Sequence, residues 1–418
     1  MKAVILGAGI TGVTTAYMLA KRGFEVTIID QHDQPAKETS FANGGQLSYR
    51  YKTPIANPAV FKQLPKISLG LDPAFKIHPT IDSHFYAWAL HFLWQCKTSN
   101  SKQSSTSMRK LGAIAQQQLY EIIKDSGINF DFRKSSGKLY VYHHHKTFQQ
   151  TIDNFIKNHE SEIWDQQTLY EKVPAFRGNP TVIGAIYDTN EDAADCHKFC
   201  VELLEYITRN YPVRFQKNHT ILEIKASQNK HRQPSITGIK TNKGLIQGDA
   251  YILTAGVHST ILSKPLALKL PIYPIKGYSV TVPATTNCPN ISVTDTDKKT
   301  VYCRLGERLR IAGFAEFSGM KADINTKRIH ALLENARQFM PDAGEYQTIQ
   351  DSWCGLRPST PDSLPIVGET GYHNLFMNTG HGMLGWTHSA ATALMTANCL
   401  TQSAQPMDIE AFSISRFR

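Results

Sequence analysis

The stretch MKAVILGAGITGVTTAYMLAKRGFEVTIID, residues 1–30, decides the fold of this chain. Residues 2–6 form a short apolar run rich in branched side chains, which predicts a buried strand, and the apolar spacing over residues 11–22 predicts a helix. Residues 25–30 form a second apolar run and predict another strand. A strand, a glycine turn, a helix and a strand in this order indicate a βαβ unit with a right-handed crossover.

The turn of this unit has the pattern G-x-G-x-x-G. Its members are Gly7, Gly9, Ile10, Thr11 and Gly12. Gly7 permits the tight turn, Gly9 lets the backbone approach a pyrophosphate, and Gly12 allows the helix to pack closely on the strand. The helix N-terminus then offers N–H groups to a diphosphate. Asp30 ends the second strand, where a carboxylate accepts hydrogen bonds from ribose hydroxyls and disfavours the 2′-phosphate of NADP. The turn therefore predicts a dinucleotide, either NAD or FAD.

Length and composition describe a globular protein of two or three domains. The chain has 418 residues, 41% hydrophobic and only 19% charged, which excludes global disorder. Its 7 cysteines are scattered without a C-x-x-C pair, so neither a disulfide framework nor a zinc ribbon is expected, and a reducing, cytoplasmic compartment fits best. No stretch approaches the ~20 apolar residues that cross a bilayer. The net charge of +10 is dispersed, so no nucleic acid partner is expected.

The remaining segments predict a discontinuous two-domain organisation of mixed α/β (α+β) class. A Rossmann-like nucleotide-binding domain is expected from residues 1–48, 193–265 and 350–418. An inserted substrate domain on an antiparallel sheet is expected from 49–192 and 266–349. Five prolines make a helix unlikely over residues 50–80. Helices are predicted over 84–96, 111–125, 195–210, 325–340 and 386–400. Strands are predicted over 139–143, 219–225, 235–241, 250–255, 271–282, 300–304, 309–314 and 375–378.

Later segments distinguish between the two dinucleotides. The stretch ETSFANGGQ, residues 38–46, holds small or hydrogen-bonding residues that suit a backbone passing close to a planar ring, namely Ser40, Asn43, Gly44, Gly45 and Gln46. A predicted strand ends at Ala255 and Gly256, where the turn can approach the adenine side of the cofactor. Residues 353–368, WCGLRPSTPDSLPIVG, place one arginine among prolines and glycines. The stretch NTGHGMLGWT precedes the last helix and contains Gly380, His381, Gly382, Met383, Leu384 and Gly385.

Together these motifs resemble the D-amino acid oxidase-like superfamily of FAD-dependent amine oxidoreductases. ETSFANGGQLS, YPIKGYS, GLRPSTPDSLPIVG and NTGHGMLGWT are most similar to the D-amino acid dehydrogenase small-subunit family, over nearly the whole chain. The resemblance implies noncovalent FAD, oxidation of D-amino acids to 2-oxo acids and ammonia, and electron delivery to a quinone or other respiratory acceptor. It also implies peripheral attachment to the cytoplasmic face of a bacterial inner membrane.

The substrate carboxylate needs a fixed cation, and arginine binds carboxylate bidentately. Arg357 is the first candidate, because the GLRP segment lies beside the flavin in the related family. Arg304, Arg308 and Arg310 are further candidates, which strand alternation places on one face, and that face is equally compatible with a solvated surface. Tyr273 and Tyr278 could supply a hydroxyl to the carboxylate or amine, or serve as packed core tyrosines, and Lys276 is a weaker candidate of the same kind.

The expected reaction is hydride transfer from the substrate Cα to flavin N5, with the protein aligning Cα and excluding water. A helix starting near residues 382–386 would direct its N–H groups at the flavin N1–C2=O region. His381 is either a further hydrogen-bond donor there or a simple turn residue.

Three interpretations of the site remain open. A glycine or sarcosine-type oxidase or a hydroxyproline dehydrogenase would use the same scaffold, and a non-catalytic flavin-binding partner is the rival from another class.

His143, His144 and His145 lack a partner at ligand spacing, so no metal site is expected. The aromatic run over residues 85–94 is interpreted as core packing, with a membrane-facing helix as the alternative.

Overall fold

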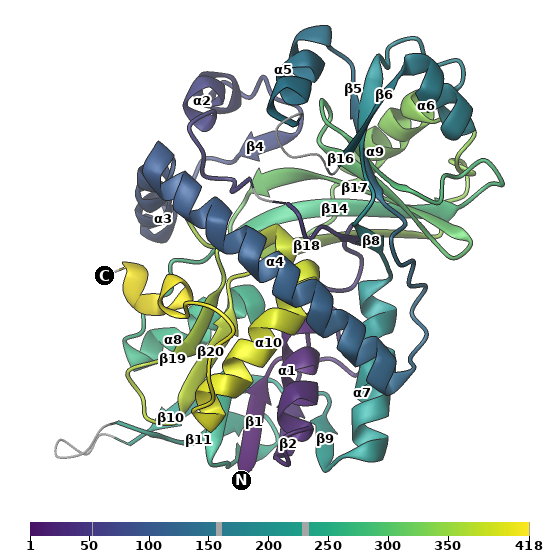
Figure 1. Ribbon diagram of the computed structural model, residues 1–418. Coiled ribbons are helices and arrows are strands. Elements are labelled where there is room, and N and C mark those ends of the chain that lie inside the picture. Colours follow the sequence, from purple (N-terminus) through teal and green to yellow (C-terminus); the bar gives the residue numbers. More distant parts are fainter. Residues whose placement is uncertain (52, 156–160, 228–233, 418) are drawn as a thin grey trace.

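The computed structural model describes residues 1–418 except 52, 156–160, 228–233 and 418. The structure has two lobes, here called the first and the second lobe, and the long helix α4 (Thr98–Ser126) runs along both (Figure 1).

The first lobe is built on a six-stranded sheet that contains the predicted βαβ unit. Its strands, in spatial order, are β19 (Ile366–Glu369), β20 (Leu375–Thr379), β13 (Ala250–Leu253), β1 (Lys2–Leu6), β2 (Glu25–Ile29) and β9 (Val213–Gln216). All neighbours pair in parallel except β19, which is antiparallel to β20. Parallel strands need both faces covered, which explains their continuous apolar sequences.

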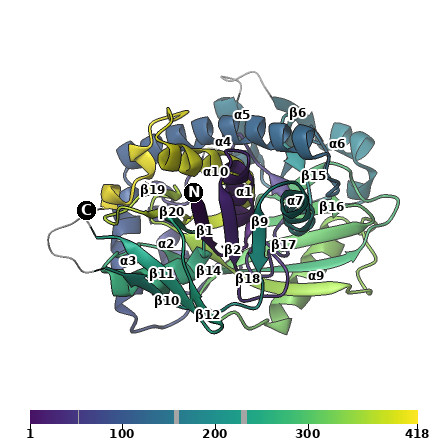
Figure 2. The same cartoon turned by 90° about the horizontal axis from the view of Figure 1, so that it is seen from below.

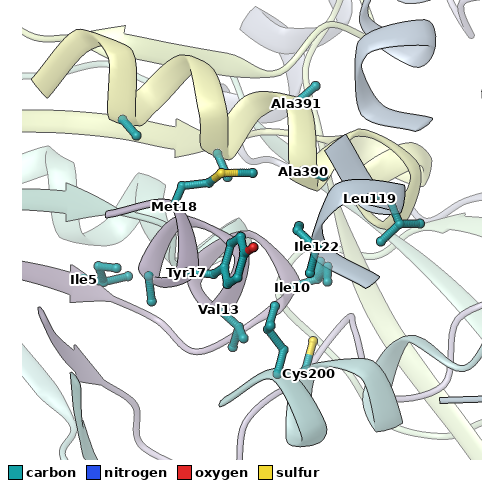
Figure 3. Packing of buried hydrophobic residues seen from close by; sticks show 14 of the residues in the cluster. Ile5, Ile10, Val13, Tyr17, Met18, Leu119, Ile122, Cys200, Ala390 and Ala391 are labelled. Carbon is teal, nitrogen blue, oxygen red and sulfur yellow. The ribbon is translucent and has the colours of Figure 1, made fainter. Parts of the chain in front are cut away.

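Helices cover one face of this sheet and a small sheet covers the other (Figure 2). The helices are α1 (Ile10–Ala20), α4, α7 (Cys196–Asn210) and α10 (Gly385–Thr401). Figure 3 shows Val13, Tyr17 and Met18 of α1 surrounded by side chains from β1, α4, α7 and α10. The opposite face packs against β10 (Ile221–Ala226), β11 (Ile236–Thr241), β12 (Gly244–Ile246) and the short α8 (Ser259–Ser263). α1 is therefore held from several sides, with its N-terminus at the glycine turn.

The second lobe is a nine-stranded, mostly antiparallel sheet. Its path is β18 (Asp351–Ser359), β14 (Tyr273–Pro283), β17 (Arg308–Phe317), β16 (Thr300–Leu305), β15 (Ser292–Asp295), β5 (Lys138–Tyr142), β7 (Gly184–Asp188) and β6 (Ser161–Asp165), and β4 (Phe75–Ile77) pairs with β17. The β5–β15 and β4–β17 pairs are parallel. Around this sheet lie α2 (Val60–Ser68), α3 (Ser83–Gln95), α5 (His145–Phe155), α6 (Gln166–Lys172) and α9 (Thr326–Phe339).

Several sequence expectations need correction. The proline-rich segment 50–80 contains the helix α2 with Pro65 inside it, because one proline removes only one intrahelical hydrogen bond while Leu64 and Ile67 pack inward. α4 begins well before the predicted residue 111, and α5 and α6 have no predicted counterpart. β18 pairs with β14 of the inserted sheet, although the predicted boundary at residue 350 assigns it to the other domain.

The segment Thr39–Ser48 joins the two lobes by crossing the nine-stranded sheet. It contacts each strand from β18 to β5 in turn. The contacts are Thr39 Oγ1 to Leu356 O (2.7 Å), Ser279 Oγ to Ala42 O (2.7 Å), Arg310 to Asn43 O (3.2 Å), Gly44 against Val301, Gln46 Nε2 to Val293 O (3.3 Å) and Lys138 Nζ to Ser48 Oγ (2.9 Å). The stretch predicted to pass close to a planar ring, residues 38–46, therefore lies largely within the segment Thr39–Ser48 between the two lobes. This segment is called the seam below.

Candidate active site

One large cavity of about 960 Å³ lies along this seam. It extends from the glycine turn of the first lobe to the inner face of the nine-stranded sheet, and α2, β4 and α3 cover it. Most of the residues singled out in the sequence line it. They are Gly7, Gly9, Ile10, Thr11, Asp30, Ser40, Asn43, Gly44, Gln46, Ala255, Gly256, Tyr278, Arg357, Gly380, His381, Gly382, Met383, Leu384 and Gly385. Gly12, Gly45, Tyr273 and Arg304 do not line the cavity.

The glycine turn has the geometry that a dinucleotide needs. Gly7 adopts φ 113°, a region that favours glycine, and its N–H donates to Ile29 O (2.9 Å). A Cβ on Gly12 would clash with the Gly7 carbonyl oxygen, so only glycine lets α1 approach the turn this closely. Gly9 has open space on the cavity side, with only Ser40 Oγ nearby. The turn thus leaves the N-terminus of α1 facing the cavity.

Asp30 is fixed at the end of β2 by two backbone amides. Ala8 N donates to one carboxylate oxygen (2.7 Å) and His32 N to the other (2.9 Å). Burial raises the pKa of Asp30, and the two amide hydrogen bonds oppose this rise. Each oxygen keeps a free lone pair for a ribose hydroxyl. The turn, Asp30 and the glycine-lined seam together fit the two halves of FAD.

The start of α10 closes the far side of the cavity. Residues Gly380 to Trp386 line it, and a 3₁₀ turn (Gly382–Leu384) leads directly into the helix. His381 Nε2 is hydrogen bonded to Thr392 Oγ1 (3.0 Å). Burial lowers the pKa of His381 to about 3, and repulsion by His388 contributes a smaller part of this shift. His381 is therefore neutral at neutral pH. The buried indole Nε1 of Trp386 has no hydrogen-bond partner among the described residues.

Arg357 lies at the opposite wall as a cation without an acidic partner. Its Nη1 donates to Phe314 O (2.9 Å), and no carboxylate of the described residues pairs with it. The absence of a side chain at Gly277 makes room for the guanidinium, which a Cβ there would strike. Loss of solvent lowers the pKa of Arg357 to about 10, so it stays protonated at neutral pH. An unpaired charge in such a cavity is a site for an anion.

The two tyrosine candidates are committed to other contacts. Tyr278 is among the cavity-lining residues, but its side chain packs in the core beside α9. Its hydroxyl donates to the buried Glu316 carboxylate (3.0 Å), and Lys276 Nζ lies 3.7 Å from the same carboxylate. Tyr273 packs against Phe85, Trp88 and Phe317, which line the cavity, but Tyr273 is not itself a lining residue. Neither hydroxyl is placed to meet a ligand in this structure.

The expectation that three arginines share one strand face is wrong. In the β16–β17 register, Arg304 pairs with Leu309, while Arg308 and Arg310 pair with Leu305 and Cys303. Arg304 therefore points to the opposite face, because the turn between the two strands shifts the alternation. There Arg304 bonds Gly306 O (3.0 Å), and Glu307 lies 3.3 Å away. On the inner face Arg308 pairs with Asp195 (2.9 Å), and Arg310 binds Thr281 and Asn43 O.

Sequence reasoning missed several residues that line the cavity. The aromatic run interpreted as core packing contributes Phe85, Trp88 and Phe92, whose helix α3 has one side against the cavity. Trp88 Nε1 donates to Ser359 O (2.8 Å), which fixes the ring beside the Arg357 strand. Lys138 and Tyr140 of β5 also line the cavity. The alternating pattern of residues 139–143 predicts their strand, but nothing in the sequence pairs it with Ser48.

The histidine run does not form a metal site in the part of the chain that the structure describes. His143 faces Asp295 (3.4 Å) and His144 faces Asp297 (2.9 Å), carboxylates that sequence spacing alone does not reveal. No group of three or more histidine, cysteine or acidic side chains gathers there as metal ligands.

Comparison with known proteins decides the family. The family model described as FAD dependent oxidoreductase (DAO) matches residues 2–399. The chain belongs to this family of FAD-dependent oxidoreductases. A D-amino acid dehydrogenase of Paramagnetospirillum magneticum is 36% identical over 100% of this chain and 99% of its own length. D-amino acid dehydrogenase 2 of Pseudomonas aeruginosa is 33% identical over 97% of this chain and 96% of its own.

Two solved structures of other proteins share the fold. L-proline dehydrogenase from P. horikoshii has a TM-score of 0.75 at 18% identity and covers 100% of this chain and 97% of its own. Glycine oxidase from Bacillus cereus has a TM-score of 0.72 at 18% identity, and the match covers 97% of this chain and 96% of the glycine oxidase chain. Within the described residues of this chain, no helix is long and apolar enough to cross a membrane.

Proposed function

We propose that this FAD-dependent oxidoreductase oxidises D-amino acids to 2-oxo acids and ammonia, with noncovalent FAD. The observation that carries the proposal is Arg357, an unpaired guanidinium in the wall of the cavity that fits FAD. Relatives named D-amino acid dehydrogenase, matched over the full chain, support the substrate class.

The glycine turn would hold the diphosphate of FAD, and Asp30 would bind a ribose. The seam and the start of α10 would hold the flavin. When bound, FAD accepts two electrons and a hydrogen from the substrate α-carbon. Arg357 binds the substrate carboxylate and thereby fixes the α-carbon. Helices α2 and α3, which cover the cavity, would keep water from the reacting atoms. The product imine hydrolyses in water.

Anaerobic addition of D-alanine to the yellow holoenzyme tests the proposal. We expect the flavin absorbance at about 450 nm to bleach, and a short-chain quinone to restore it faster than oxygen does. Stable colour with D-alanine and with a wider panel of D-amino acids would contradict the proposed substrate class. Equal or faster reoxidation by oxygen, with peroxide formed, would instead identify an oxidase.

We also propose that the acceptor is a quinone reached at a membrane surface through α2 and α3. The outer side of these elements exposes large apolar side chains, here called the apolar face: Phe61, Leu69, Leu71, Ile81, Tyr86, Leu90 and Trp94. Exposed Lys62, Lys66 and Lys97 flank it, and Lys97 Nζ lies 3.2 Å from the centre of the Trp94 ring. Apolar side chains beside lysines fit an anionic lipid surface.

Replacement of Leu90 by glutamate tests the membrane contact. Leu90 is 70% exposed, so Leu90→Glu costs the folded protein little, but it places a negative charge against the lipid. We expect binding to vesicles with anionic lipid to weaken at least about tenfold, as measured by co-sedimentation. The matched control is Leu222→Glu, on the remote strand β10, where the leucine is 55% exposed. Equal vesicle binding by both variants would rule out the apolar face as the membrane contact.

A further inference from the structure

The cavity wall beside Arg357 is apolar and aromatic. Six lining residues pack there in one hydrophobic cluster, here called the aromatic pocket: Trp88, Ala89, Phe92, Ile275, Ala315 and Phe317. The ring centres of Trp88 and Phe92 lie 5.1 Å apart in a stacked arrangement, and those of Trp88 and Phe317 lie 5.9 Å apart. Neither the binding of FAD along the seam nor that of a carboxylate at Arg357 uses these side chains.

The strand registers place the aromatic pocket next to the guanidinium of Arg357. The guanidinium lies over Gly277 of β14, where a Cβ would clash with it, and its Nη1 donates to Phe314 O of β17 (2.9 Å). Ile275 is two residues from Gly277 on the same face of β14 and pairs directly with Arg357. Ala315 follows Phe314 in β17. Because two residues of a strand span about 7 Å, the pocket begins close to a carboxylate bound at Arg357.

The seam lies on the other side of the guanidinium. Ser279 is two residues from Gly277 in the opposite direction along β14, and its Oγ donates to Ala42 O of the seam (2.7 Å). A carboxylate on Arg357 thus has the seam about 7 Å away on one side and the aromatic pocket at a similar distance on the other. With the α-carbon facing a flavin on the seam, a side chain that extends away from the seam would enter the pocket.

The aromatic pocket continues along the strands away from the seam. The β14–β17 register places Phe317 beside Ile275, and Tyr273 stacks on Phe317 with ring centres 6.2 Å apart. Trp88 Nε1 donates to Ser359 O (2.8 Å), which fixes the indole over the end of β18. Three strands and one helix therefore hold the rings of the pocket in place.

The surroundings of the pocket offer no partner to a charged side chain. Of the described residues that α2, β4 and α3 contribute to the cavity lining, only Gln63 is polar apart from the Trp88 indole, and that indole already donates to Ser359 O. Lys299 lines the cavity, but its Nζ donates to Asp72 (3.1 Å). An ammonium or carboxylate entering the pocket would lose water without gaining a partner, whereas a ring or a branched chain is stabilised by leaving water.

We infer that the aromatic pocket is the side-chain subsite of this enzyme and that it selects D-amino acids with large apolar side chains, such as D-phenylalanine and D-leucine. The inference rests on the proposed function, because the amino acid must first be held at Arg357. A methyl group reaches only the rim of the pocket, so kcat/KM for D-phenylalanine should exceed that for D-alanine by about tenfold or more. D-lysine and D-glutamate should be poorer substrates than D-leucine by at least the same factor.

The first test measures binding without turnover. The ligands 3-phenylpropanoate and propanoate share a carboxylate, lack the amine and differ by a phenyl ring. Their dissociation constants for the holoenzyme are read from the change they cause in the flavin spectrum. We expect 3-phenylpropanoate to bind about tenfold or more tightly than propanoate. Succinate, whose second carboxylate would enter the pocket, should bind no more tightly than propanoate.

The second test fills the pocket from the helix. Ala89 is half-buried on the inner side of α3, and leucine there remains a good helix former while it occupies space in the pocket. Ala89→Leu should lower the ratio of kcat/KM for D-phenylalanine to that for D-alanine by about tenfold and change the D-alanine value less than about threefold. Ala87→Leu is the matched control, because Ala87 is exposed on the same helix and does not line the cavity. It should leave the ratio unchanged.

The third test removes a ring from the sheet side. Phe317→Ala should reduce the preference for 3-phenylpropanoate over propanoate by about five- to tenfold, because the phenyl ring loses one of its apolar contacts. Phe215→Ala is its control: Phe215 is also half-buried in a strand, β9 of the first lobe, and does not line the cavity. A similar loss of melting temperature in the two variants, with the preference changed only in Phe317→Ala, separates selection of the ligand from stability.

Three results would overturn the inference. Equal dissociation constants of the wild type for 3-phenylpropanoate and propanoate would show that the side chain does not enter the pocket. An unchanged preference in both Ala89→Leu and Phe317→Ala would show the same. A parallel loss for D-phenylalanine and D-alanine in both variants would place these residues at the cofactor or the reacting atoms. Failure of the proposed function is a separate observation: no D-amino acid would reduce the flavin, while the binding test would still report on the pocket.

Discussion

Arg357→Met should lower kcat/KM for D-alanine by about 10²- to 10⁴-fold while the protein stays yellow. The guanidinium is the unpaired cation in the cavity wall, so its loss removes the charge-assisted hydrogen bonds that hold the carboxylate, about 3–5 kcal/mol. Arg357→Lys keeps the charge but loses the planar guanidinium. Its kcat/KM for D-alanine should lie between those of the wild type and Arg357→Met. The measurement is anaerobic flavin reduction at increasing D-alanine concentration.

The Arg357 variants need a control for charge alone. Arg209→Met serves, because that side chain is exposed on α7 and pairs only with Glu205 on the same helix (2.7 Å), within the residues that the structure describes. Its kinetics should match the wild type. Flavin reduction by Arg357→Met at the wild-type rate and affinity would show that the substrate carboxylate binds elsewhere. That result would also contradict the proposed orientation of the amino acid.

Gly12→Ala should yield a protein that is purified nearly colourless and melts several degrees lower. A methyl group at this position meets the Gly7 carbonyl oxygen, so α1 must move away from β1 and the glycine turn must open. Both changes displace the N–H groups that face the diphosphate, and a backbone shift in a packed core costs about 1–3 kcal/mol. The measurements are the flavin content after purification and the melting temperature with and without added FAD.

Gly371→Ala is the matched glycine control. Gly371 is exposed, a methyl group there would meet no described atom within 4 Å, and its φ is not positive, so the change should alter neither colour nor melting temperature. If Gly12→Ala retains full flavin with unchanged affinity, the close approach of α1 to the turn is not needed for the cofactor.

The first lobe could be predicted well because its signals are local. The glycine turn, the apolar runs on both sides of it and the cap residue Asp195, whose side chain accepts from Lys198 N (3.0 Å), each specify structure within a few residues. The predicted helix over 195–210 accordingly matches α7 almost residue for residue. The same holds for the strand and helix that follow residue 374, where a glycine turn again separates two strong patterns.

What the sequence could not supply depends on pairing between distant segments. α2 forms despite Pro65 because its inner side chains cover the cavity, which no local rule anticipates. Arg304 points away from Arg308 because the strand turn changes the alternation, and that requires the register. Lys138 lines the cavity because β5 lies beside Ser48, a residue far away in the chain, and no local pattern indicates that pairing. Local patterns therefore predicted many of the residues that line the cavity near the glycine turn, while the wall formed by the second lobe required tertiary structure.

The seam Thr39–Ser48 limits how this enzyme can open. Hydrogen bonds and close contacts connect it to successive strands of the second lobe from β18 to β5, so any opening motion that carried the seam along with the first lobe would have to break these contacts together. α2 and α3 form the wall between the cavity and the exposed apolar face. Entry of substrate and exit of product are thus expected through displacement of this wall, with the two lobes moving as one rigid body.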